Sequence, residues 1–205
     1  MQQSPDISKI LAKYMPTIAV PFIVTWVSEQ PTSIKITAKR KTVLGTYMSP
    51  ANETDRHTIT INGDLNPYSF LLTFVHEIAH LKVWLKHKNN VQPHGKEWQT
   101  TYRNLLAKVL HVFPTDAANA ISNYMLSPTA ATCRDEDLYK ALKKYDIKKT
   151  EHILLEELPE HAIFSVEDGR VFKKGQKLRK FFRCMDMKTN HIYRVSAMME
   201  VKEVK

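Results

Sequence analysis

The pattern of hydrophobic and polar residues in the first third of the chain predicts a short helix followed by a small sheet. Apolar residues recur at helical spacing over residues 7–14, and Pro16 ends this helix. Several runs rich in β-branched and other apolar residues follow, and each predicts a strand. These runs are residues 20–27, 33–38, 43–48 and 57–61.

A change of period after Asn62-Gly63, which is a turn signal, predicts a helical region. Asn66 is the expected cap of a long helix that begins at Pro67. The helix has an apolar stripe at every third or fourth position, formed by Phe70, Leu71, Phe74, Val75, Ile78 and Leu85. Further helices are expected over residues 96–110 and 114–126.

Ser127-Pro128-Thr129 is the predicted domain boundary. Beyond it, residues 135–145 predict a short charged helix, and residues 164–204 predict several short strands. Two turns are expected among these strands, at Asp168-Gly169 and Lys174-Gly175. We therefore predict an α+β fold, with helices around a small sheet over residues 1–127 and a charged, β-rich region over residues 128–205.

The charge of the chain is positive overall and unevenly distributed. Its net charge is +9. Residues 129–169 hold 6 basic and 10 acidic residues, whereas residues 170–205 hold 11 basic and 3 acidic residues. A basic C-terminal segment favours a polyanionic partner, most often nucleic acid. The alternative is a solvated basic surface that keeps the protein soluble.

Composition also indicates the compartment. The 2 cysteines can neither build a disulfide framework nor fill a four-thiolate zinc site. The first residues lack the pattern of a secretory signal. The longest apolar stretch, residues 18–27, is broken by Pro21 and Thr25 and is far short of the roughly 20 residues that span a bilayer. We expect a cytoplasmic protein with no membrane span.

The strongest chemical signal is His76-Glu77-Ile78-Ala79-His80, an HExxH motif inside the long predicted helix. Residues four apart lie one turn apart on the same face, so both imidazoles can reach one ion. Glu77 lies beside them and can accept a proton from water at the metal. The motif therefore predicts a zinc site, with His76 and His80 as ligands and Glu77 as the general base.

The residues alone leave the third zinc ligand open. A catalytic zinc usually has three protein ligands and one open position. His87 follows His80 by seven residues, about 10.5 Å along the helix axis, and is too distant. Glu97 suits the chemistry, and His94 lies in a loop between Pro93 and Gly95 that can fold back to the metal.

A family resemblance bears on this choice. Asp64-Leu65-Asn66-Pro67-Tyr68 leads into Phe74-Val75 and the HExxH motif, and Pro93-His94-Gly95-Lys96-Glu97-Trp98 follows. This arrangement closely resembles the SprT-like metallopeptidases, whose eukaryotic relative Spartan cleaves proteins crosslinked to DNA. The resemblance covers about residues 40–110. It implies a zincin-like domain in which His94 is the third zinc ligand.

The C-terminal region departs from the pattern of that family, in which many members end in a zinc ribbon held by paired cysteines. Here Cys184 is followed by Met187 at the second cysteine position, and Cys133 lies some fifty residues earlier. We therefore expect a metal-free, ribbon-like β region and one zinc ion per chain. A lone Cys184 is expected to be a small buried apolar residue.

A basic run in the same region predicts contact with nucleic acid. It contains no acidic residue and has Phe181, Phe182 and Tyr193 close by. Basic groups beside aromatic rings suit contact with the backbone and bases of single strands. The candidate contacts are Lys173, Lys174, Lys177, Arg179, Lys180 and Arg183.

These inferences together predict a monomeric, zinc-dependent endopeptidase that acts on DNA-bound or crosslinked proteins. As an edge strand, residues 43–48 would pair with an extended substrate through main-chain hydrogen bonds. One alternative is a metal-binding nucleic-acid adaptor, against which the intact Glu77 argues. Another is a zinc hydrolase of a non-peptide bond. The group that stabilises the oxyanion is left open among Tyr47, Tyr102, Arg103 and His111.

Overall fold

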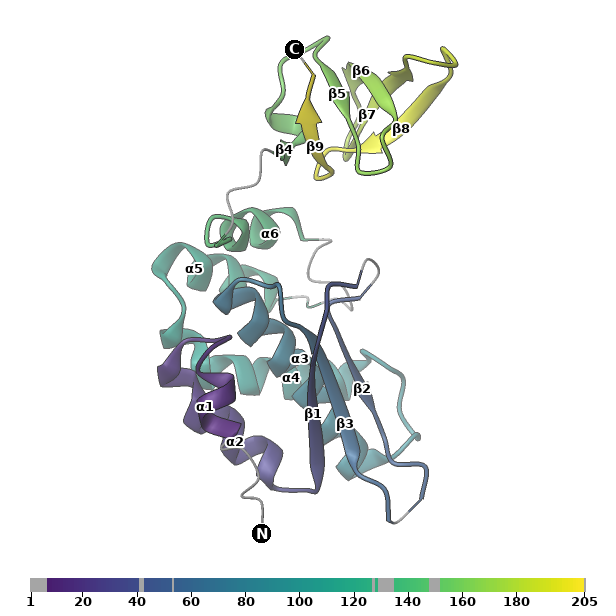
Figure 1. Ribbon diagram of the computed structural model, residues 1–205. Helices are drawn as coiled ribbons and strands as arrows, with labels where there is room; N and C mark the ends of the chain where they lie inside the picture. Colours follow the sequence, from purple (N-terminus) through teal and green to yellow (C-terminus); the bar gives the residue numbers. More distant parts are fainter. Residues whose placement is uncertain are drawn as a thin grey trace. The chain divides into compact units, whose positions relative to one another are not determined.

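The computed structural model describes residues 7–40, 43–52, 54–126, 128, 135–147 and 152–204 (Figure 1). The chain divides into Met1–Asp146, called unit 1 here, and Ile147–Lys205, called unit 2. The division drawn from the sequence, between residues 127 and 128, lies earlier. The difference concerns helix α6 (Glu136–Lys143), which packs against helix α5 (Thr115–Tyr124) and so belongs to unit 1.

The described residues of unit 1 combine helices with a three-stranded sheet. Besides α5 and α6, its helices are α1 (Ile7–Leu11), α2 (Val20–Ser28), α3 (Pro67–His87) and α4 (Lys96–Val109), with short 3₁₀ turns η1 (Thr17–Ala19) and η2 (Leu110–Val112). The strand order is β1 (Thr32–Thr37), β3 (His57–Asn62), β2 (Gly45–Met48). Strand β1 is parallel to β3, and β2 is antiparallel to it. Within the described residues, β2 is therefore an edge strand.

The prediction of a strand over residues 20–27 is wrong, because these residues form α2. A short apolar run with β-branched residues fits a buried helix as well as a buried strand. Pro21 stands in the first helical turn, where proline is tolerated. Val20, Ile23 and Val27 recur on one helical face and are buried in the core. Packing of that face therefore outweighed the β propensity of the run.

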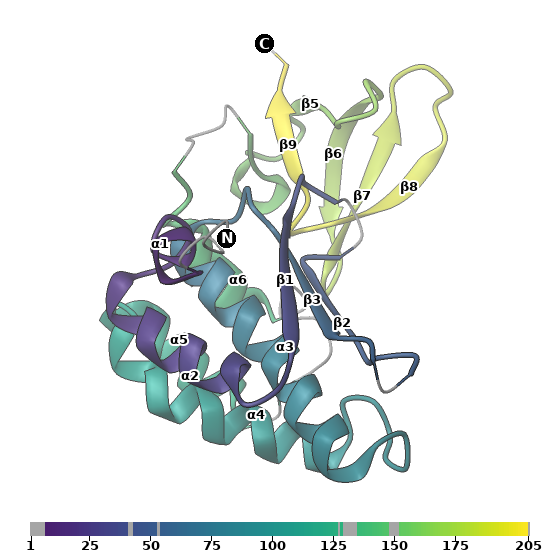
Figure 2. The same cartoon turned by 60° about the horizontal axis from the view of Figure 1, so that its bottom comes forward.

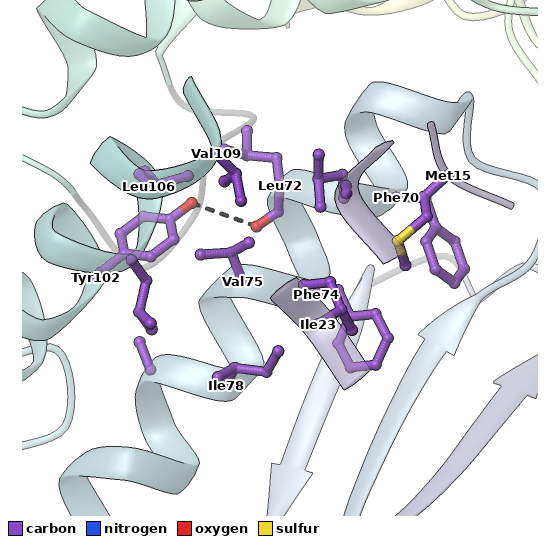
Figure 3. Packing of buried hydrophobic residues seen from close by; sticks show 14 of the residues in the cluster. Met15, Ile23, Phe70, Leu72, Phe74, Val75, Ile78, Tyr102, Leu106 and Val109 are labelled. Carbon is purple, nitrogen blue, oxygen red and sulfur yellow. Dashed lines mark hydrogen bonds between the residues drawn. The ribbon is translucent and has the colours of Figure 1, made fainter. Parts of the chain in front are cut away.

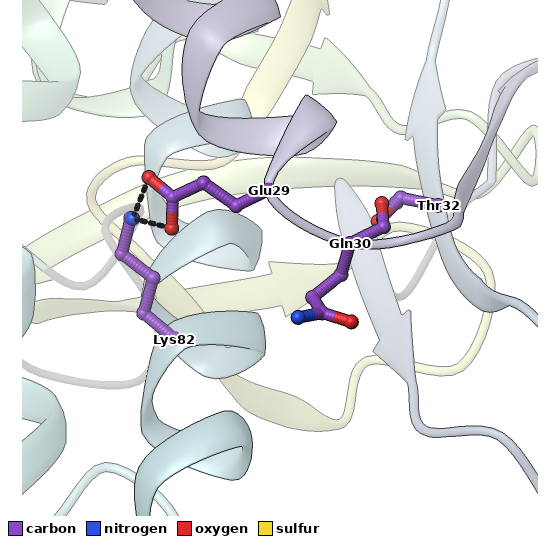
Figure 4. A network of polar contacts seen from close by, with 4 residues as sticks. All are labelled: Glu29, Gln30, Thr32 and Lys82. Carbon is purple, nitrogen blue, oxygen red and sulfur yellow. Dashed lines mark hydrogen bonds and ion pairs between the residues drawn. The ribbon is translucent and has the colours of Figure 1, made fainter.

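The end of α2 is joined to α3 by an ion pair. Lys82 of α3 donates hydrogen bonds of 2.8 and 2.7 Å to the two carboxylate oxygens of Glu29, as Figure 4 shows. Both side chains are partly exposed, so the pair contributes at most about 1 kcal/mol to stability. It lies next to the turn that leads into β1, where the Thr32 hydroxyl donates to the Gln30 carbonyl.

Helix α3 lies at the centre of unit 1. It packs against β2 and β3 on one side and against α4 on the other (Figure 2). Its middle is therefore buried on almost every side. Figure 3 shows the apolar packing at this centre, where Tyr102 of α4 donates a hydrogen bond to the Leu72 carbonyl of α3.

Asn66 caps α3 as predicted, since its side-chain oxygen accepts hydrogen bonds from the amides of Tyr68 and Ser69. The same side chain also donates to the Leu142 carbonyl and to the Asp146 carboxylate. These bonds attach the end of α6 to the start of α3. They give a physical reason for the grouping of α6 with unit 1.

In the part of unit 2 that the structure describes, six strands form an antiparallel sheet. The strand order is β4 (Ile153–Leu154), β9 (Glu200–Glu203), β5 (Ile163–Ser165), β6 (Val171–Lys177), β7 (Phe181–Asp186), β8 (Ile192–Ser196). A 3₁₀ turn, η4 (Leu155–Glu157), follows β4. Cys184 is completely buried in the core of this unit, as expected, whereas Cys133 lies outside the described residues.

The turn expected at Lys174-Gly175 is absent, because both residues lie inside β6, at a shift of register against β7. A Cβ atom on Gly175 would lie 2.5 Å from the Arg183 carbonyl oxygen, so glycine permits the close approach of the two strands. The glycine therefore marks a bulge and not a chain reversal.

Among the helices that the structure describes, none has both the length and the apolar character that a membrane span requires.

Candidate metal centre

The three predicted histidines converge on one point between α3 and the loop that precedes α4. The Nε2 atoms of His76 and His80 are 3.2 Å apart, and they lie 3.1 and 2.9 Å from Nε2 of His94. Mutual hydrogen bonds cannot join all three pairs, because each Nε2 carries only one hydrogen or one lone pair. Nitrogens held about 2.05 Å from a tetrahedral zinc ion lie about 3.3 Å apart. The geometry therefore fits a single zinc ion.

A tight turn brings His94 to the helix. The amide of Gly95 donates to the Gln92 carbonyl, and the Gln99 side chain donates to the carbonyl of His94. His94 itself has a φ of 58°, in the left-handed region that non-glycine residues seldom adopt. Such strain persists where the surrounding structure enforces it, and it is common at functional sites.

Aromatic side chains enclose the histidines. The Trp98 ring lies 4.6, 5.4 and 4.7 Å from the rings of His76, His80 and His94, and it stacks on Tyr102. Only 1% of the surface of Trp98 is exposed, so this residue lines the back of the site and is also part of the core. From the first turn of α4, its ring therefore contacts all three imidazoles.

Burial keeps the histidines uncharged, as metal ligands must be. Desolvation lowers the pKa of His76 to about 3 and that of His80 to about 4, with a smaller effect from the neighbouring histidines. Burial also lowers the pKa of His94. At neutral pH the site therefore presents lone pairs and not imidazolium cations.

Glu77 belongs to α3, and its side chain is buried against strand β2, with 5% of its surface exposed. Burial raises the pKa of its carboxyl to about 8, although the charge of Arg40 and a hydrogen bond from the Tyr47 amide act in the opposite direction. A Cβ atom on Gly45 would lie 2.8 Å from a carboxylate oxygen of Glu77. The missing side chain of Gly45 therefore leaves room for Glu77 beneath β2.

The comparisons with known proteins agree with this site. The model of the SprT-like family matches residues 22–119. These residues form a SprT-like domain. The domain includes the sheet of unit 1, the three histidines and Glu77, so the predicted SprT-like resemblance is confirmed for residues 22–119, and the α+β fold is confirmed as well. The family is associated with zinc and with a metallopeptidase type of activity.

One curated relative is Protein SprT of Cronobacter sakazakii, which is 46% identical to this chain over 48 residues. The matched stretch is 22% of this chain and 28% of that protein, so the chain spans well under half the length of this relative. The search of solved structures gave no match. Unit 2 lies beyond the SprT-like domain.

The structure also sorts the other candidates in the SprT-like domain. Among the described residues, the group that could hold a metal consists of the three histidines, without His87 or Glu97. Tyr102 is buried against Leu72, and Arg103 donates to the carbonyls of Met125 and Leu126. Two of the candidates lie beside the metal site: the ring of Tyr47 is almost parallel to that of His80 at 6.4 Å, and the buried ring of Tyr102 meets that of His76 edge-on at 5.5 Å.

The predicted basic residues of unit 2 do not share one surface. Lys173 and Arg183 are exposed on the same face of the sheet, since Lys173 pairs with Met185, two residues from Arg183. Lys174 faces the core instead. Its ammonium group donates hydrogen bonds of 3.2 and 2.5 Å to the carbonyls of Glu156 and Leu158. Lys174 is therefore not part of the predicted nucleic-acid contact surface, because its ammonium group is buried and bonded to main-chain carbonyls of the same unit.

Sequence reasoning missed one member of this face. Arg194 of β8 is directly opposite Arg183 of β7, and its guanidinium lies 5.2 Å from the Phe181 ring. The alternation of residues along β8 could have indicated which face of the sheet Arg194 occupies. Only the pairing of β8 with β7 shows that Arg194 lies opposite Arg183. Lys177 lies opposite Phe182, which is buried, whereas Arg179 and Lys180 belong to the connection between β6 and β7.

Proposed function

We propose that this protein is a zinc-dependent endopeptidase of SprT-like type. The observation that supports the proposal most directly is the convergence of three uncharged histidines within 2.9–3.2 Å, with the buried Glu77 next to them in sequence. When bound, zinc would supply Lewis acidity that polarises a carbonyl and makes water more acidic. His76, His80 and His94 would hold it, which leaves an open position for chemistry.

Glu77 would carry the proton during the reaction. The positive charge of bound zinc would oppose the rise in the pKa of Glu77 and favour its carboxylate, which would accept a proton from the attacking water and later pass it to the leaving amine. The Tyr47 amide and the space at Gly45 hold this carboxylate at β2. As an edge strand of the described sheet, β2 offers main-chain groups to an extended peptide segment. Such pairing would bind many sequences, because main-chain groups are common to all of them.

The activity is tested with the zinc-loaded protein and an unfolded substrate such as casein. We expect cleavage into fragments, loss of cleavage when a chelator removes the metal, and recovery when zinc is restored. Electrophoresis and mass spectrometry of the fragments measure this. Hydrolysis of a small ester without any peptide cleavage would contradict the proposal and support a non-peptide hydrolase.

We also propose that the protein acts on DNA-bound or crosslinked proteins and that unit 2 contacts the nucleic acid. Arg183 and Arg194 are directly opposite on an exposed face, with Lys173 and Phe181 on the same side. Like charges directly opposite one another are destabilising unless an anion neutralises them. A phosphate backbone fits the arginine pair, and an exposed aromatic ring such as Phe181 suits a stacked base. Such binding would place the protein in the cytoplasm, at the nucleoid.

Removal of this arginine pair should weaken binding to single-stranded DNA. On single strands, each phosphate contact contributes about −0.7 to the slope of log affinity against log salt, so Arg183→Ala with Arg194→Ala should flatten the slope by about 1.4. Fluorescence anisotropy at several salt concentrations measures it. The control is Lys86→Ala with Lys108→Ala, which removes two exposed charges from unit 1. Equal effects of both double variants would indicate general electrostatics and no binding face.

A further inference from the structure

A chain of ring contacts extends from the metal centre into the sheet and returns to α3. The ring of Tyr47 on β2 is almost parallel to that of His80, with an angle of 8° and a centroid distance of 6.4 Å. The Tyr47 hydroxyl and Nδ1 of His57 on β3 are 2.9 Å apart. The His57 ring meets Trp84 of α3 edge-on at 4.9 Å. Each ring therefore restricts the next one.

His57 is a polar residue in an almost wholly buried position, with 5% of its surface exposed. A buried polar group is costly unless it is hydrogen-bonded, and an apolar residue would fill the same space at lower cost. The hydroxyl of Tyr47 supplies that hydrogen bond. Burial lowers the pKa of His57, which favours the neutral ring, and a neutral imidazole can share one hydrogen bond with the hydroxyl through Nδ1. The pair therefore fixes the position of the Tyr47 ring.

Tyr47 also contacts the other functional residue of the site. The strand that carries Tyr47 lies against Glu77, since a Cβ atom on Gly45 would be 2.8 Å from a carboxylate oxygen of Glu77, and the Tyr47 amide lowers the pKa of that carboxyl. Strand β2 is therefore adjacent to both Glu77 and His80. Strand β2 is only four residues long and is paired, within the described sheet, on one side only. Such a strand needs a further attachment to hold its amide in place over α3. The bond between Tyr47 and His57 is such an attachment, and it adds to the 2.6 Å contact between the hydroxyls of Thr46 and Thr60 that also joins β2 to β3.

We propose that Tyr47 and His57 are positioning residues, which together lock the edge strand β2 over the metal centre and thereby orient Glu77. The catalytic part of this inference rests on the proposed peptidase function. The locking itself concerns only this chain and is measurable without any reaction. Because the hydroxyl bonds to His57, its loss should disturb β2 and leave the zinc ligands in place.

The test compares Tyr47→Phe, His57→Leu and their double variant with the parent, each in the zinc-loaded form. Hydrogen–deuterium exchange at residues 45–48 should be about tenfold faster in all three, with residues 32–37 of β1 unchanged, because a broken attachment releases only the edge strand. The zinc affinity should stay within about threefold. Tyr14→Phe is the matched control, since it removes a hydroxyl elsewhere in unit 1.

Kinetics and rescue separate positioning from a general loss of structure. If the parent cleaves peptides, the kcat of Tyr47→Phe and His57→Leu should fall about 10- to 100-fold with little change in KM, because misplacement of a catalytic group lowers kcat. The double variant should be no slower than either single one, since both remove the same bond. His57→Asn keeps a hydrogen-bonding group near the place of Nδ1 and should recover most of the rate.

Unchanged exchange at residues 45–48 would overturn the inference, as would additive effects in the double variant. A loss of zinc as large as that caused by removing a ligand would also overturn it, because Tyr47 would then support the metal and not Glu77. If the parent cleaves no peptide, the proposed function fails. The exchange and zinc measurements would still decide whether the lock exists.

Discussion

Replacing Glu77 with glutamine is expected to lower the rate of peptide hydrolysis by about 10²–10⁴-fold, because general-base assistance contributes that much. Glutamine has nearly the same shape, so it should fit beneath β2 beside Gly45, but it cannot accept the proton from water. Zinc should remain bound, since the group of side chains that could hold a metal consists of the three histidines and does not include Glu77. Initial rates on an unfolded protein substrate, normalised to the zinc content, measure the effect.

The matched control is Glu97→Gln, which makes the same chemical change in the first turn of α4. Glu97 lies outside the group of metal-binding side chains in the described residues, so this variant should retain the rate of the parent. Equal rates for Glu77→Gln and the parent would show that the reaction needs no base at this position. The assignment of Glu77 as the general base of an HExxH peptidase would then be wrong.

Replacing His94 with alanine is expected to weaken zinc binding by more than about 100-fold, because even the loss of a group that only orients a ligand costs 10–100-fold. Its Nε2 lies 2.9–3.1 Å from those of His80 and His76, and its removal would leave the ion with two protein ligands. Competition with a chelator of known affinity measures the change. Elemental analysis of the parent should find one zinc per chain.

His87→Ala is the control for this loss. His87 is the last residue of α3 and lies apart from the three histidines, so its removal should leave zinc affinity unchanged. The opposite order, with loss of zinc from the His87 variant and retention by the His94 variant, would reassign the third ligand. Two zinc ions per chain would contradict the expectation that unit 2 binds none.

Local sequence was sufficient for the elements whose signals act over a few residues. The cap at Asn66, the proline after it and the apolar stripe predicted the start of α3 at Pro67 and its course as far as Leu85, two residues before its observed end. Because the histidines of HExxH are one helical turn apart, their shared face followed from the helix itself. The run over residues 20–27 lacked such a signal. Its apolar residues fitted either structure, and packing against the core made it a helix.

By itself, the sequence determined that one helix carries two histidines and a glutamate in HExxH spacing, and that the C-terminal segment is basic. These properties depend on residue type and on spacing within single elements. Only the tertiary structure brought His94 to the other two histidines and placed Tyr47 between His80 and His57. It also separated Lys174 from the exposed basic residues and paired Arg183 with Arg194. The physical reason is that such contacts join residues far apart in the chain, and strand register and core packing decide which of them meet.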